Sequence, residues 1–205
     1  MAKKLNQLER IALITLVLLV ALSAGLYLSQ LLTNNPSAEL ATRQLGGDFT
    51  LNSLNGPVSL SDYKGQGVIV MFGYTYCPDI CPTGLANLGA ALNRLSEAEQ
   101  QQLQPMFISV DPDRDTPDRL DQYSRYFHPS LLGLTASKPE IDPVVKAYGA
   151  FYRKVDMPNS AMKYSVDHSA RIYLIDRNGQ MIEALHHNTP TAELATALQK
   201  LLLQS

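Results

Sequence analysis

The sequence predicts an α/β domain in which one central sheet is covered by helices on both faces. Two uncharged, mostly apolar runs, residues 68–72 and 106–110, are typical of strands that are buried on both sides. Helical patterns follow each run, and the chain closes with a hairpin around Asn178-Gly179 and an amphipathic helix. Strands that alternate with helices in this way indicate a layered α/β fold.

The predicted elements follow one another along the chain. Residues 49–51 and 58–60 flank the turn Asn55-Gly56-Pro57 and predict an N-terminal hairpin. The elements predicted after it are, in order, a strand at 68–72, a helix at 82–95, a strand at 106–110, a helix at 117–127 with Thr116 as its N-cap, a strand at 131–135, a helix at 140–151, strands at 171–176 and 181–185, and a helix at 192–203. This order predicts a thioredoxin-like α/β three-layer sandwich, in which the reactive loop follows a central strand.

The start of the chain predicts a membrane anchor. Residues 1–10 carry Lys3, Lys4 and Arg10 against one acidic residue, and residues 11–32 contain no charge. The uncharged run is long enough to cross a bilayer as a helix, and it exceeds the about 7–15 apolar residues of a removable signal peptide. Because basic residues stay on the cytoplasmic side, residues 1–10 are predicted to be cytoplasmic and residues 11–32 to form a single transmembrane helix.

A polar linker at 33–42 and one domain at 43–205 are predicted to follow on the other side of the membrane. No Arg- and Ser-rich presequence precedes the apolar run, which favours a single-pass protein of the bacterial inner membrane with its C-terminal domain in the periplasm. A domain of this size is stable without disulfides, so the two cysteines are free for chemistry. With a formal net charge of −2 and no basic cluster beyond the first ten residues, nucleic-acid binding is excluded.

Both cysteines lie in one stretch, residues 72–82, directly after a predicted buried strand. Pro82 suits the first position of a helix, so Cys81 is predicted at a helix N-terminus, where the helix dipole favours a thiolate. Cys77 and Cys81 can form a reversible disulfide, exchange disulfides with a partner, or chelate Cu(I) or Zn(II). A purely structural disulfide is disfavoured, because closing so short a loop contributes only about 2 kcal/mol.

His168 is the third candidate ligand. It precedes the predicted strand 171–176, and in the predicted sheet the loop entering that strand lies beside the cysteine loop. Two cysteines and a histidine form a coordination set for copper or zinc, and Asp167 could orient the imidazole. The remaining histidines, His128, His186 and His187, are expected to be ordinary polar residues.

Three function classes fit a cysteine pair in such a fold: a metallochaperone, a thiol-disulfide oxidoreductase that works without metal, and a peroxiredoxin. The peroxiredoxin motif requires Thr and Pro three and seven residues before the reactive cysteine, where this chain has Tyr74 and Val70. His168 separates the other two classes, since a dithiol exchanger needs no imidazole at its sulfurs. Ordinary thioredoxins also carry a proline before the facing strand, and residues 166–171 contain none.

On these residues the chain resembles the Sco (SenC) copper chaperones of cytochrome c oxidase assembly. The motifs that carry the resemblance are Phe72-Gly73-Tyr74-Thr75 before Cys77-Pro78-Asp79-Ile80-Cys81-Pro82, then Asp111-Pro112-Asp113-Arg114-Asp115-Thr116-Pro117, and Asp167-His168-Ser169 before Tyr173-Leu174-Ile175-Asp176. The resemblance extends from about Gly46 to the C-terminus and includes the single N-terminal anchor. It implies that Cys77, Cys81 and His168 bind copper, one ion per chain.

The resemblance also implies the partners. Copper would be delivered to the copper-bearing subunit of cytochrome c oxidase or to another copper-accepting protein, or the cysteines of that centre would be reduced. Because the periplasm favours a disulfide between Cys77 and Cys81, a periplasmic thiol reductant is expected as well. The expected protein is thus mainly a metallochaperone with accompanying thiol-disulfide reductase activity, and the alternative is a periplasmic oxidoreductase without metal.

Four further features of the sequence lie outside the predicted ligand set. Many Sco proteins have His immediately before the first cysteine, whereas this chain has Tyr76. No auxiliary ligand is therefore predicted at this position, and the predicted copper site consists of the three principal ligands. Asp79 could hold a backbone turn or face a partner. Residues 111–117 are expected to be mainly structural. Residues 153–163 are predicted to form a mobile loop, whose Met157 and Met162 either fill gaps or offer thioether contacts to copper.

Overall fold

The computed structural model of the protein describes residues 7–33 and 45–204. The chain divides into two compact units, Met1–Gln44 and Leu45–Ser205. The predicted domain boundary at residue 43 and nearly all of the predicted linker at 33–42 lie outside the described residues, as do residues 1–6.

The first unit contains one helix, α1 (Gln7–Thr33), whose side chains are exposed throughout residues 13–29. Among the helices within 7–33 and 45–204, none combines the length and the hydropathy that crossing a membrane requires. The prediction of a transmembrane helix at residues 11–32 is therefore not supported by the described part of the chain. Thr33, predicted as the first linker residue, is the last residue of α1.

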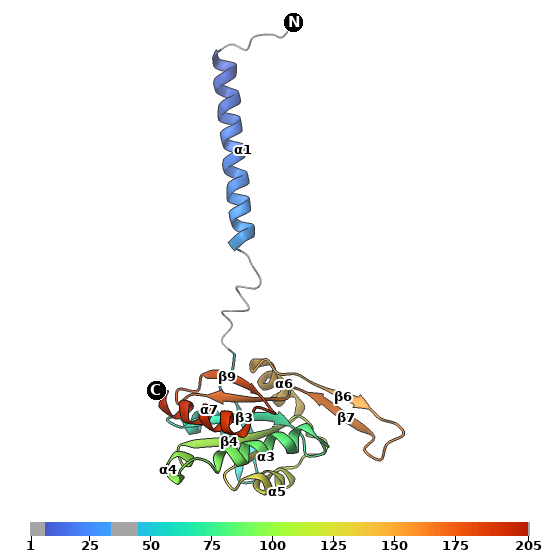
Figure 1. The fold of residues 1–205 in the computed structure, drawn as a ribbon. Helices are drawn as coiled ribbons and strands as arrows, with labels where there is room; N and C mark the ends of the chain where they lie inside the picture. The colour runs from blue at the N-terminus through green and yellow to red at the C-terminus, as the bar shows by residue number, and fades with distance from the viewer. Residues whose placement is uncertain (1–6, 34–44, 205) are drawn as a thin grey trace. The chain divides into compact units, whose positions relative to one another are not determined.

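The second unit is built on a five-stranded sheet with the order β5-β4-β3-β8-β9 (Figure 1). Its strands are β3 (Gly67–Gly73), β4 (Leu103–Ser109), β5 (Leu132–Leu134), β8 (Arg171–Ile175) and β9 (Met181–His186). Strands β3, β4 and β5 are parallel, whereas β8 runs antiparallel to β3 and β9 antiparallel to β8. Strand β3 is therefore central and buried along its whole length, as the apolar run predicts.

Two separate hairpins and several helices complete this unit. The hairpins are β1 (Thr50–Ser53) with β2 (Gly56–Ser59), and β6 (Tyr152–Asp156) with β7 (Tyr164–His168). The helices are the 3₁₀ helix η1 (Leu60–Tyr63) and the α-helices α3 (Ile80–Leu92), α4 (Glu97–Gln100), α5 (Pro117–Phe127), α6 (Lys138–Ala147) and α7 (Thr191–Leu203). Thr116 caps α5 as predicted, because its side chain accepts a hydrogen bond from the Arg119 amide.

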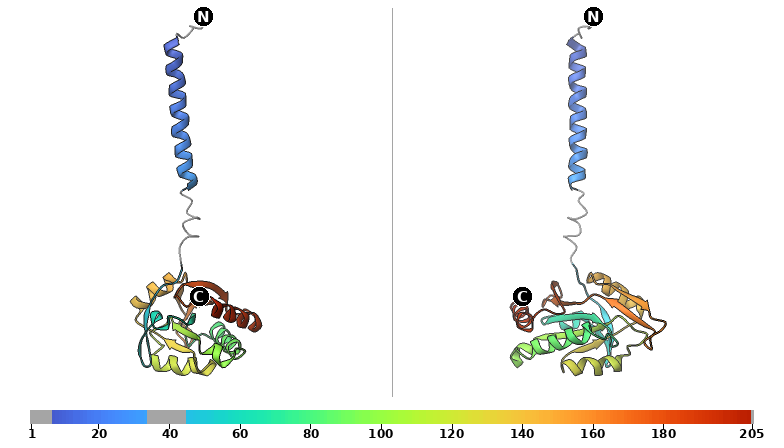
Figure 2. Two further views of the ribbon diagram at one scale, coloured as in Figure 1. Left: turned by 90° about the vertical axis from the view of Figure 1, so that its left-hand side faces the viewer. Right: turned by 45° about the vertical axis from the view of Figure 1, so that its right-hand side comes forward.

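Helices cover the sheet on both faces. Helices α3 and α7 pack side by side (Figures 1 and 2). Met71 and Gly73 of β3 point toward α3, since they adjoin Gly84 and Cys81 of that helix. Phe72 points the opposite way and packs edge-on against Tyr148, the residue that follows α6. The predicted α/β layering is therefore confirmed.

Several predicted elements differ in their bounds, and two of them differ most. The sequence places a helix at 140–151, but α6 begins at Lys138, where Ser137 and Glu140 form a capping box, and it ends before Gly149, whose φ of +63° suits glycine. The predicted loop at 153–163 is in part a strand, because β6 pairs with β7. Most side chains of β6 are exposed, so this strand lacks the buried apolar pattern that would reveal it in the sequence.

Candidate metal centre

The cysteine loop starts at the end of the central strand. Strand β3 ends at Gly73, and the loop that follows carries Cys77 before α3 begins at Ile80. Cys81 is thus the second residue of the helix, and α3 starts two residues earlier than predicted. Pro82 does not interrupt the helix, because the first four N–H groups of a helix have no partner within it. Cys81 therefore lies at a helix N-terminus, as expected.

The sheet register brings His168 to the same place. Strands β3 and β8 are antiparallel, with Met71 opposite Ile172, so the residues before β8 lie beside the residues after β3. His168 is the last residue of β7 and precedes β8 by a short connection. The prediction that this histidine lies beside the cysteine loop is confirmed, although it sits at a strand end rather than in a loop.

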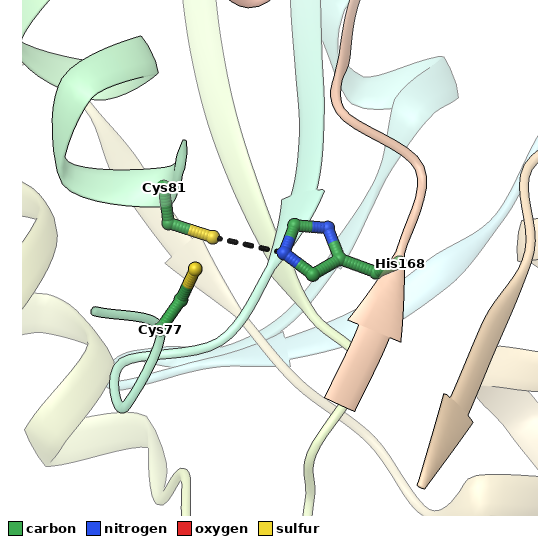
Figure 3. Close-up of side chains that lie close together, drawn as sticks. All are labelled: Cys77, Cys81 and His168. Carbon is green, nitrogen blue, oxygen red and sulfur yellow. Dashed lines mark hydrogen bonds between the residues drawn. The ribbon is translucent and has the colours of Figure 1, made fainter. Parts of the chain in front are cut away.

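The three side chains converge on one point (Figure 3). The Sγ atoms of Cys77 and Cys81 and a ring nitrogen of His168 all lie within 4.8 Å of one another, and Cys81 Sγ is 3.3 Å from His168 Nε2. All three residues are buried, and both cysteines are free thiols. Within residues 7–33 and 45–204, this is the one group of three or more His, Cys, Asp or Glu side chains that could hold a metal ion.

The orientation of the His168 ring follows from the hydrogen bond of its Nδ1 atom. His168 Nδ1 lies 3.0 Å from the backbone carbonyl oxygen of Ser169, and a carbonyl oxygen can only accept a hydrogen bond. Nδ1 therefore carries a proton, and Nε2 faces the sulfurs, where it can donate to a thiolate when protonated or bind a metal ion when not. A ring fixed in this way is the usual arrangement of a metal-binding histidine.

The two thiols differ in acidity. A hydrogen bond from the Cys81 thiol lowers the pKa of Cys77 to about 4, and His168 and the backbone amides of Asp79 and Cys81 add to this effect against the opposing effect of burial. The pKa of Cys81 is raised, because its thiol donates a hydrogen bond to Cys77 and is buried. The prediction that the helix N-terminus makes Cys81 the thiolate is therefore wrong, and Cys77 is the more acidic thiol. At neutral pH the pair thus holds one thiolate, which can act as a nucleophile or as a soft ligand.

Gly73 leaves the space that the Cys81 sulfur occupies. A Cβ atom at position 73 would lie 2.5 Å from Cys81 Sγ and 2.6 Å from the Phe107 ring, both closer than atoms can approach. The glycine in the motif therefore allows the sulfur to lie directly over the end of β3. The sequence shows this glycine within a motif but gives it no role, because the close approach exists only in the fold.

The segment 111–117 supports the cysteine loop, which agrees with the structural role predicted for it. The buried carboxylate of Asp115 accepts hydrogen bonds from the Thr75 amide at 3.0 Å, the Thr75 hydroxyl at 2.6 Å and the Ser109 hydroxyl at 2.6 Å. Asp115 thereby fixes the loop two residues before Cys77. This support joins residues 40 positions apart in the chain, so no local pattern reveals it.

Tyr76 and Asp79 flank the first cysteine with different surroundings. The ring of Tyr76 lies beside two guanidinium groups, with its centroid 4.7 Å from Arg114 Cζ and 4.4 Å from Arg119 Cζ. Asp79 is exposed and occupies the N-cap position of α3, where its carbonyl accepts from the Thr83 amide at 3.1 Å and its side chain makes no capping bond. Its backbone thus shapes the turn, and contact with a partner stays a prediction.

The other sequence candidates lie apart from the centre. Met157 and Met162 belong to the turn of the β6–β7 hairpin, at the end remote from His168. The remaining histidines have separate partners: His128 bonds to Ser130, His186 bonds to Asn188, and the rings of His186 and His187 are in contact. The metal-binding group thus contains none of these side chains, which agrees with the ordinary roles expected for the three histidines.

The fold and the site together define a thioredoxin-like protein whose cysteine pair and histidine suit thiol redox chemistry or the binding of a soft metal ion. The model of the SCO1/SenC family matches residues 37–203. The chain belongs to the SCO1/SenC family, which confirms the resemblance found in its motifs.

Curated relatives come from mitochondria and bacteria. The mitochondrial protein SCO2 of Saccharomyces cerevisiae is 41% identical over 145 residues, which are 70% of this chain and 48% of that protein. The SCO2-like protein RC0895 of Rickettsia conorii is 37% identical over 157 residues, 76% of each chain. This chain thus spans about half the length of the yeast relative.

Solved structures share the fold over the second unit. Bradyrhizobium japonicum ScoI with copper bound is 36% identical with a TM-score of 0.70, covering 77% of this chain and 99% of that one. Arabidopsis thaliana ScoI with copper bound is 36% identical with a TM-score of 0.72, covering 78% and 99%. Yeast Sco1 with copper bound is 38% identical with a TM-score of 0.66, covering 78% and 87%.

Proposed function

We propose that this protein is a copper metallochaperone that binds one copper ion through Cys77, Cys81 and His168 and passes it to another protein. The observation that carries the proposal is the convergence of two sulfurs and one imidazole nitrogen within 4.8 Å, on a fold whose relatives have been solved with copper bound. The acceptor proposed from the family resemblance is the copper-bearing subunit of cytochrome c oxidase or another copper-accepting protein.

The donor set favours a transferable Cu(I) ion over a structural Zn(II) ion. Thiolate and imidazole ligands suit both metals, but structural zinc sites almost always have four protein ligands. In the described part of the chain, no fourth His, Cys, Asp or Glu joins the three residues. A site with three donors leaves the ion accessible to a ligand from an acceptor protein, as transfer requires.

A second candidate function is thiol-disulfide exchange without metal. It is favoured by the lowered pKa of Cys77 and by the complete burial of Cys81 beside it. In this function the Cys77 thiolate attacks a partner disulfide and releases one partner thiolate, and Cys81 then displaces the second partner sulfur as the Cys77–Cys81 disulfide forms. A thiol reductant must return the pair to two thiols before the next cycle.

Metal titration of the reduced protein separates the two functions. We expect Cu(I) to saturate at one ion per chain, because the three donors form a single site, and we expect elemental analysis to find copper retained after dialysis. The same titration with Zn(II) is the matched comparison. Saturation by zinc alone, or retention of no metal by a reduced and folded protein, would refute the chaperone function and leave thiol exchange.

The compartment is proposed from the sequence alone. Lys3, Lys4 and Arg10 precede the uncharged run at 11–32, and this charge pattern favours a cytoplasmic N-terminus with the copper domain in the periplasm. A reporter enzyme that is active only in the periplasm should therefore be active when fused after Ser205. Activity instead from a cytoplasm-specific reporter at the same position would show that the proposed location is wrong.

A further inference from the structure

The three proposed ligands are held by two separate pieces of the fold. Cys77 and Cys81 belong to the loop and helix that follow the central strand, whereas His168 ends the β6–β7 hairpin. In the part of the chain that the structure describes, this hairpin forms its own two-stranded sheet and shares no backbone ladder with the five-stranded sheet. Figure 1 shows the hairpin projecting from one end of the domain. Side chains must therefore hold it against the cysteine loop.

Arg114 contacts both pieces. On the hairpin side, its guanidinium stacks on the Tyr164 ring with Cζ 3.7 Å from the centroid, and Nη1 donates to the Tyr164 carbonyl oxygen at 3.1 Å. On the cysteine side, the same guanidinium lies over the ring of Tyr76, the residue before Cys77. A planar guanidinium can lie flat on a ring while its edge donates hydrogen bonds, a geometry that the compact ammonium group of lysine does not offer.

A buried carboxylate fixes this arrangement. Asp111 is 4% exposed, pairs with Arg114 Nε, and accepts a hydrogen bond from the Tyr164 hydroxyl at 2.8 Å. Arg114 itself has a side chain that is only 14% exposed. The pair thus orients the guanidinium toward Tyr164, and removing either partner would leave the other charge buried and unpaired.

The strand between Tyr164 and His168 is attached to the same loop. The Val166 amide donates to the Tyr74 hydroxyl at 3.3 Å, and the Tyr74 ring packs edge-on against the His168 ring with centroids 5.7 Å apart. Strand β7 is thus supported at Tyr164 by Arg114 and at Val166 by Tyr74. The base of the hairpin, where the Ser169 amide donates to the Phe151 carbonyl oxygen, lies next to His168.

We infer that Arg114 is a positioning residue, which holds the β6–β7 hairpin against the cysteine loop and so sets the place of His168 relative to the two sulfurs. Its role concerns the ligand geometry and not contact with the metal. The copper readout of this inference rests on the proposed function, whereas its hydrogen-exchange readout does not.

The first test measures amide hydrogen exchange in the metal-free, reduced full chain. In Arg114→Met, the amides of β6 and β7 should exchange about tenfold faster than in the wild type, while those of β3 and β8 should not change. The matched control is Arg177→Met. Like Arg114, Arg177 donates to a backbone carbonyl oxygen, here that of Leu202 at 3.1 Å, but its partners Leu202 and Gln102 do not belong to the hairpin. Unchanged hairpin exchange in Arg114→Met, or equal acceleration in Arg177→Met, would overturn the inference.

The second test is a double-mutant cycle on Cu(I) affinity. Arg114→Met should weaken binding about tenfold in the wild-type background and have no further effect in the His168→Ala background, because the arginine acts through that histidine. An equal loss in both backgrounds would show that Arg114 acts through the cysteines or the fold, and would refute the inference. Arg114→Lys keeps the charge and should give a smaller loss, so it replaces Arg114→Met if the latter does not fold.

Failure of the two proposals can be told apart. If the wild type binds no copper, the proposed function fails, and the exchange rates of the hairpin still decide the role of Arg114. If the wild type binds copper and neither Arg114 variant changes affinity or hairpin exchange, the proposed function stands and the positioning role is refuted.

Discussion

Replacing His168 with alanine is expected to weaken Cu(I) binding by about a hundredfold or more, because loss of a residue that merely supports a metal ligand already costs about 10–100-fold in affinity. The change removes the nitrogen that lies 3.3 Å from Cys81 Sγ and leaves two sulfurs to hold the ion. Competition with a Cu(I) chelator measures the affinity. Cys77→Ser and Cys81→Ser should lose at least as much, since thiolates are the softer ligands.

His186→Ala is the matched control for this experiment. His186 is an exposed histidine at the end of a strand, and its ring bonds to Asn188 rather than to the cysteine pair. Its removal should leave copper affinity unchanged. Circular dichroism must show that each variant keeps the wild-type fold. If a folded His168→Ala protein retained full affinity, the three-ligand site would be wrong and metal-free thiol exchange would become the better function.

The protein with a closed Cys77–Cys81 disulfide is expected to take up essentially no copper. A sulfur in a disulfide is no longer a thiolate, and a single imidazole is a poor site for Cu(I). The two Sγ atoms lie within 4.8 Å of each other, so bringing them to the bond length of about 2.05 Å requires only a local movement. Cys77 can make that movement because it lies in the loop before α3.

Titration of oxidised and reduced samples with Cu(I), without added reductant, tests this gating. The oxidised protein should remain metal-free, and prior reduction should restore binding of one ion. In an oxidising compartment the protein would then need a thiol reductant before it can load copper. Equal affinity of both forms would show that the ligands are other atoms, and a Cys77→Ser, Cys81→Ser double variant would then be expected to bind copper as well.

The sequence alone predicted the core of this fold because its elements carry strong local signals. The run at 68–72 is buried on both faces, and Thr116-Pro117 marks the start of α5, so both were located without tertiary information. The gathering of Cys77, Cys81 and His168 also followed from the sequence, since the order of strands places the end of β3 beside the start of β8. The membrane anchor, by contrast, is not supported by the described residues.

The tertiary structure decided the features whose contacts join distant parts of the chain. Strand β6 of the β6–β7 hairpin has no buried residue, so its sequence shows no apolar alternation. The roles of Arg114, Asp115 and Gly73 depend on contacts with Tyr164, Thr75 and Cys81, and only the folded sheet brings these pairs together. Local patterns thus located the reactive groups, whereas long-range packing alone determined which residues hold them in place.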